Sequence, residues 1–73
     1  MTRIKKLAQD FLDLADSLNI EVSRYLNGSK RLEDLEAYLK VLESEKAFLV
    51  ALYDETGEKY KCCLNYELAE SYL

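Results

Sequence analysis

The chain has 73 residues, which is enough for a single domain, and we expect that domain to span residues 1–73. Ten basic and fourteen acidic residues give a net charge of -4, which opposes long-range attraction to nucleic-acid phosphates. The chain contains no histidine, so it lacks the commonest general base and the commonest metal ligand. The composition therefore predicts a small acidic protein that is not an enzyme.

The first expected element is one long amphipathic helix over residues 3–26. Ile20 interrupts its pattern because it falls on the polar face, and Asn27-Gly28 then supplies residues that tolerate the left-handed backbone that ends a helix. The apolar face repeats at helical spacing and consists of Ile4, Leu7, Ala8, Phe11, Leu14, Ala15, Leu18, Val22, Tyr25 and Leu26.

The second expected helix begins near Lys30, with Ser29 as its N-cap, and ends near residues 43–45. Val41 falls on its polar face, and the run 47–53 beyond it is apolar on every side, so the helical pattern fails there. The short connection between the two helices predicts an antiparallel αα-hairpin. The apolar side of this helix is a narrow seam at three- and four-residue spacing, made by Leu32, Leu35, Leu39 and Leu42.

Residues 48–64 fit a β-hairpin. Asp54-Glu55-Thr56-Gly57 has aspartate at the first position and glycine at the fourth position of a type I turn with a glycine bulge. A helix through this stretch would instead end on Asp54 and Glu55, whose charges oppose the helix dipole. The hairpin places three apolar pairs on one face, Leu52 with Tyr60, Val50 with Cys62, and Phe48 with Leu64. A third long helix is the alternative, because alanine, leucine and glutamate tolerate helices well.

Asn65 is expected to cap a short closing helix that turns Leu68, Ala69 and Tyr72 inward. The resulting order is α-α-β-β-α. This is an α+β fold in which an αα-hairpin packs on a two-stranded β-hairpin and a short C-terminal helix closes the domain. An all-α three-helix bundle is the alternative fold.

The two cysteines, Cys62 and Cys63, are adjacent and would point to opposite faces of a strand, so they are not expected to bind one metal ion. We interpret Cys62 as a small core residue and Cys63 as an outward one, and we expect no catalytic residue, metal or cofactor. No segment resembles a targeting signal, and the longest apolar run is too short for a membrane span. Free thiols without a signal indicate a cytoplasmic protein.

Several apolar side chains fall outside the expected core and predict a protein interface. These are Ile20, Tyr38, Val41, Leu49, Tyr53 and Cys63. The predicted function is therefore a protein-binding module that acts as an adaptor, small subunit or inhibitor. Homodimer formation is expected to help so small a core. The alternative is a nucleic-acid-binding or transcription-related accessory protein that uses the basic N-terminal residues Arg3, Lys5 and Lys6.

Overall fold

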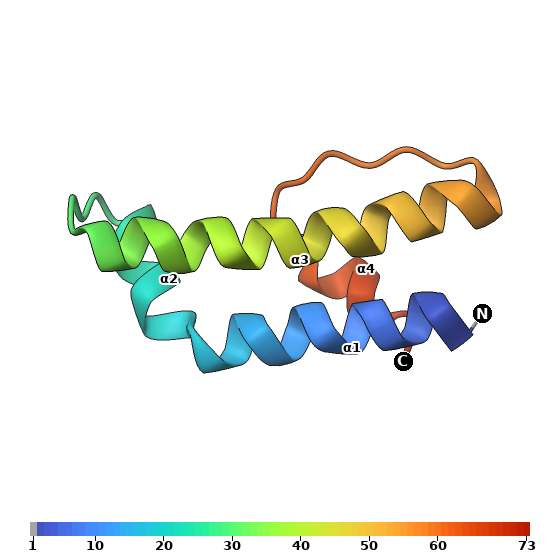
Figure 1. Cartoon of the computed structure of the whole chain (residues 1–73), viewed down its shortest axis with the longest axis horizontal. Coiled ribbons are helices and arrows are strands. Elements are labelled where there is room, and N and C mark those ends of the chain that lie inside the picture. The colour runs from blue at the N-terminus through green and yellow to red at the C-terminus, as the bar shows by residue number, and fades with distance from the viewer. Residues whose placement is uncertain (1) are drawn as a thin grey trace.

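The computed structural model, which describes residues 2–73, has four helices and no strand within those residues (Figure 1). The helices are α1 (Thr2–Ser17), α2 (Asn19–Leu26), α3 (Leu32–Thr56) and α4 (Tyr66–Glu70). α1 and α3 run antiparallel, as expected, α2 also packs along α3, and α4 packs on α1 (Figure 1). The fold is a helical bundle, so the predicted α+β fold is wrong and its all-α alternative describes the class.

The predicted β-hairpin is replaced by helix over residues 48–56. Gly57 ends α3 in the left-handed conformation, with φ of 76°, and its N–H donates to the Tyr53 carbonyl at 2.8 Å. The Thr56 hydroxyl donates to the Leu52 carbonyl, also at 2.8 Å. A glycine with positive φ closes both a hairpin loop and a helix, so the same residues fit both.

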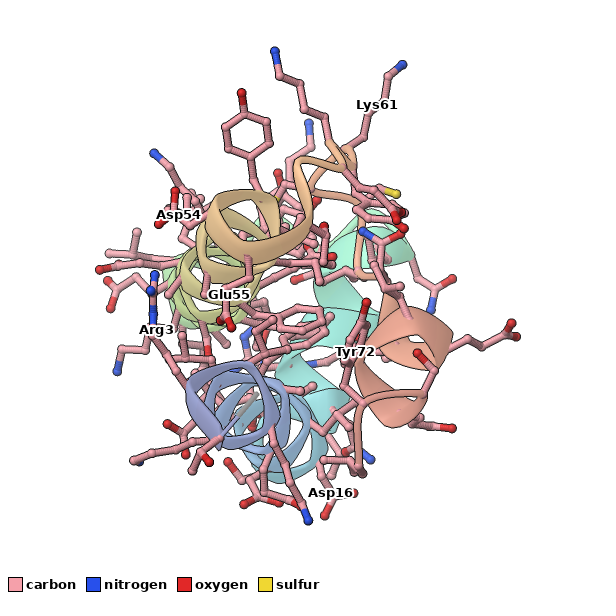
Figure 2. The ribbon with its side chains drawn as sticks, turned by 90° about the vertical axis from the view of Figure 1, so that its right-hand side faces the viewer. Arg3, Asp16, Asp54, Glu55, Lys61 and Tyr72 are labelled. Carbon is pink, nitrogen blue, oxygen red and sulfur yellow. The ribbon has the colours of Figure 1, made fainter. Side chains whose placement is uncertain are left out.

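A salt bridge offsets the unfavourable charge at the end of α3. Arg3 of α1 and Asp54 lie side by side (Figure 2), with 3.1 Å between Nη2 and Oδ2. Both side chains are more than half exposed, so this pair stabilises the fold only modestly. It nevertheless brings a cation to the negative end of the α3 dipole.

The expected helix over residues 3–26 is bent at Leu18, whose φ of -111° lies outside the helical region. Backbone hydrogen bonds from Leu18 to Leu14 and from Val22 to Leu18, each 3.0 Å, continue across the bend. The apolar face is largely as predicted, because Ile4, Ala8, Phe11, Ala15 and Val22 are buried, but Leu26 is exposed. The bend directs α2 toward α3 (Figure 1).

An aromatic cluster fills the core between α1, α3 and α4. Phe11 and Phe48 are fully buried with their ring centroids 6.5 Å apart. Tyr66 stacks on Phe11 at 5.5 Å, and Tyr72 meets Phe48 edge-on at 6.0 Å. Figure 2 shows Tyr72 directed between the three helices. The predicted inward position of Ala69 is confirmed, whereas Tyr60, expected opposite Leu52, is exposed.

α3 turns a different face to the core from the one expected. Leu32 and Leu39 of the predicted seam are 67% and 51% exposed, whereas Val41, expected on the polar face, is fully buried. The buried stripe contains two acids, so it looks polar in the sequence. Its members recur at helical spacing and are Asp34, Ala37, Val41, Glu45, Phe48, Ala51 and Leu52, with Leu49 at the margin.

The Phe48→Ala substitution is expected to lower the free energy of unfolding by about 3–5 kcal/mol, because it empties the centre of the aromatic cluster. Urea unfolding followed by circular dichroism measures this change. Val50→Ala is the matched control, since Val50 lies on the same helix and is 49% exposed. It should cost less than about 1 kcal/mol. Equal losses for the two variants would contradict the burial pattern of α3.

Candidate functional site

Glu45 fixes the connection between α3 and α4, residues 57–65, against α3. Its carboxylate is fully buried and forms no ion pair with any lysine or arginine of residues 2–73. Oε1 accepts the Leu64 N–H at 2.9 Å and the Cys62 thiol at 3.1 Å. Oε2 accepts the backbone and side-chain N–H groups of Asn65 at 2.6 and 2.7 Å. Four donors thus replace the hydration of a buried carboxylate.

The backbone at Leu64 is shaped to present these donors. Leu64 has a φ of 62°, which is unusual for a residue with a side chain. Successive amide groups around such a residue can point to one side and form a concave anion-binding nest. Here the anion is the carboxylate of Glu45. Asn65 stands at the N-cap position of α4, as predicted, but its side chain binds Glu45 and the Lys61 carbonyl instead of capping α4.

Both cysteines are free thiols. Burial, the hydrogen bond to Glu45 and the charge of that carboxylate together raise the pKa of the Cys62 thiol to about 11. At neutral pH the group therefore stays protonated and donates its hydrogen bond, so it is a poor nucleophile. Cys62 is exposed overall, which corrects its predicted place in the core, and Cys63 is exposed as predicted. Within residues 2–73, no group of three or more cysteine, aspartate or glutamate side chains is placed to hold a metal ion.

Asp34 fixes the connection between α2 and α3 in a similar way. Its fully buried carboxylate accepts hydrogen bonds from Arg24 Nε and Nη2, the shortest at 2.9 Å, and from the Ser29 hydroxyl at 2.6 Å. The predicted N-cap Ser29 lies two residues before the observed one, Arg31, whose N–H it accepts at 3.2 Å. The hydrogen bonds from Arg24 and Ser29 hold the pKa of Asp34 below its ordinary value.

The outer face of α3 carries the leucine seam, defined as Leu32, Leu35, Leu39 and Leu42. Leu32 and Leu39 are exposed, and Leu35 and Leu42 are half-buried. The same alternation of three and four residues continues through Lys46, Leu49 and Tyr53. This is the heptad spacing by which helices pair in coiled coils.

Beyond Leu42 the same side of α3 lines a groove of about 360 Å³ between α3 and residues 57–65, which we call the α3 groove. Its α3 side includes Leu49, Val50 and Tyr53, and its other side includes Tyr60 and Cys62. Because the Cys62 thiol donates to Glu45, Glu45 fixes the Cys62 end of the second wall of this groove.

The six predicted interface residues are dispersed. Val41 and Leu49 are buried, although Leu49 also lines the α3 groove together with the exposed Tyr53. Tyr38 is half-buried and stacks on Tyr25 with 4.6 Å between ring centroids. Ile20 and Cys63 are exposed, on α2 and on the α3–α4 connection.

Sequence reasoning missed the seam itself as a surface. The sequence pattern predicts a core position for its leucines, because leucine usually lies inside. The signal that could have identified it is the unbroken heptad spacing from Leu32 to Tyr53 with a lysine, Lys46, in the middle. A strictly inward helix face would not be expected to carry a lysine at its centre.

The basic residues of the N-terminus do not form one patch with those before α3. Arg3 pairs with Asp54, Lys6 pairs with Asp10 at 3.3 Å, and Arg31 pairs with Glu33 at 2.7 Å. The starts of α1 and α3 also lie at opposite ends of the bundle (Figure 1).

Comparison of the chain with protein families, with curated proteins and with solved structures gives no match. In the part of the chain that the structure describes, no helix combines the length and apolar character needed to cross a membrane.

The Glu45→Gln substitution is expected to lower the free energy of unfolding by about 2–3 kcal/mol. An amide nitrogen would face two of the four donors and leave them unsatisfied. Urea unfolding measures the loss, and Glu43→Gln, on the exposed side of the same turn, is the matched control with little effect. Equal stability of the two variants would contradict the anchoring role of Glu45.

Asp34 should make stability sensitive to acid. Because its pKa is lower in the folded chain than its ordinary value of 3.8, the unfolded chain takes up the proton first as pH falls. The contribution of Asp34 to the free energy of unfolding is complete at pH values above that ordinary pKa. It is lost as the pH falls through the pKa of Asp34 in the folded chain. Asp34→Asn should lower the urea midpoint at neutral pH and make this midpoint fall less in acid. Asp16→Asn, on the exposed face of α1, should leave both the midpoint and its pH dependence unchanged. An unchanged acid profile in Asp34→Asn would contradict this assignment.

Proposed function

We propose that this protein is a non-enzymatic protein-binding module that pairs with a second copy of itself through the leucine seam of α3. The observation that carries the proposal is the exposure of Leu32 and Leu39, 67% and 51%, on a face with heptad spacing. Apolar side chains that are contiguous, exposed and regularly spaced mark a surface for another helix. The proposal keeps the cytoplasmic location expected from two free thiols.

Antiparallel pairing of two copies matches the seam with itself. Leu35 of one copy would lie opposite Leu39 of the other, and Leu32 would lie opposite Leu42. The four leucines of each copy then interdigitate as the a and d residues of a short coiled coil. Because the spacing of the four leucines is the same in both chain directions, the seam fits a second antiparallel copy better than it fits an unrelated helix.

The alternative function, nucleic-acid binding by the N-terminus, has weaker support because Arg3 and Lys6 already pair with acids.

Sedimentation equilibrium or size-exclusion chromatography with light scattering, run into the high micromolar range, tests this proposal. The chain should form a dimer that dissociates on dilution, since so short an interface gives moderate affinity. Leu39→Glu should make it monomeric with an unchanged circular dichroism spectrum.

Ile20→Glu is the matched control, because Ile20 is 62% exposed on α2 and lies outside the seam. This variant should dimerise like the parent chain. A parent chain that stays monomeric, or a dimer that Leu39→Glu leaves intact, would refute pairing through the seam.

A further inference from the structure

The α3 groove has a largely apolar lining. Leu49, Val50 and Tyr53 of α3 line it, together with Tyr60 of the connection. Tyr53 and Tyr60 are both exposed, although a tyrosine ring has a large apolar surface to bury. The groove is open along its length, which suits a chain segment better than a small enclosed ligand.

The rim of the groove is positively charged on a protein with a net charge of -4. Lys46 and Lys59 line it, and Lys61 follows on the same connection and projects into solvent (Figure 2). None of these lysines forms an ion pair with a residue of the described chain. Lys59 instead places its ammonium 5.5 Å from the centroid of the Tyr53 ring. The nearby Glu58 accepts a hydrogen bond from the Tyr60 hydroxyl at 2.5 Å.

The connection beside the groove also has free backbone groups. The N–H groups of Lys59, Tyr60 and Lys61 donate no hydrogen bond within residues 2–73, and this stretch has no helix or strand. Unpaired backbone of this kind can bind an extended peptide, whose carbonyl groups accept the hydrogen bonds. Glu45 holds the connection only beyond this stretch, through Cys62, Leu64 and Asn65.

We propose that the α3 groove binds a short, extended, acidic segment of a partner protein. Carboxylates of the segment would pair with Lys46 and Lys59, and its alternate apolar side chains would pack on Val50 and the two tyrosine rings. This inference deepens the proposed protein-binding function, but it rests on other residues than the leucine seam. A long polyanion is a poorer fit, because the overall negative charge of the chain repels it outside the groove.

The test is a fluorescence anisotropy titration of the full chain with a labelled ten-residue peptide in which aspartate alternates with leucine or phenylalanine. The same peptide with lysine in place of aspartate is the first control, and single-stranded oligothymidine is the second. We expect micromolar affinity for the acidic peptide only, weakening as salt increases. No binding of the acidic peptide, or equal binding of either control, would overturn the proposal.

The residues are tested by charge reversal. Lys46→Glu combined with Lys59→Glu should weaken binding at least about tenfold, as expected when close charge pairs are reversed. The matched control reverses Lys5 and Lys6, two exposed lysines on α1, and should leave the affinity unchanged. Equal losses in the two double variants would overturn the assignment of the groove.

The two proposals can fail separately. Leu39→Glu should abolish dimerisation and keep peptide binding. A dimer that does not bind the acidic peptide would refute the groove alone, and a monomer that binds it through Lys46 and Lys59 would refute the seam alone.

Discussion

Burial of the Glu45 carboxylate is the constraint on which the arrangement of the second half of the chain depends. A carboxylate removed from water is strongly destabilising unless hydrogen bonds replace its hydration. Glu45 obtains them from three residues near the end of the connection, Cys62 by its thiol and Leu64 and Asn65 by their amides. The connection must return to the middle of α3 to supply them. α4 begins directly after this contact and is thereby placed on α1.

Asp34 and Glu45 also decide which face of α3 points inward. Both lie on the stripe that contacts α1 and α2, one near the start of the helix and one near its centre. Satisfying both acids orients the whole 25-residue helix, because its side-chain directions are fixed relative to one another. The leucines of the seam then face outward. The core of the protein and its proposed binding surface are therefore two results of the same orientation.

The sequence predicted the parts of the fold that follow from simple amphipathic periodicity. The apolar face of the first helix, the antiparallel hairpin and the closing helix after Asn65 were recovered on this basis. The inward face of α3 does not follow from periodicity, because it includes Asp34 and Glu45. A hydrophobic pattern places acidic residues on the outside of a helix. Their partners, Arg24, Ser29, Leu64 and Asn65, lie 5 to 20 residues away, and local patterns carry no information on such contacts.

The misplaced hairpin has a related cause. Residues 47–53 are apolar on every side, although the helix buries only Phe48, Leu49, Ala51 and Leu52 and leaves Ala47, Val50 and Tyr53 exposed. A helix whose exposed side is also apolar shows no amphipathic pattern. The same error changed the expected exposure of two of the predicted interface residues. Val41 and Leu49 were placed outside by a helix register and a strand that do not exist, whereas Tyr53 is exposed under either fold.

The connection after α3 is held at its two ends and unsupported in its middle. Gly57 is hydrogen-bonded to the last turn of α3, and Cys62, Leu64 and Asn65 are hydrogen-bonded to Glu45, but Lys59 and Lys61 lie between them on exposed, non-helical backbone. Exposed lysines on backbone without helix or strand are accessible to cleavage by a trypsin-like protease. After cleavage there, α4 would still be retained by Glu45 and by the rings of Tyr66 and Tyr72. The cleaved protein would be a complex of two fragments. In the intact chain, the peptide bond between them mainly keeps the two parts at a high local concentration.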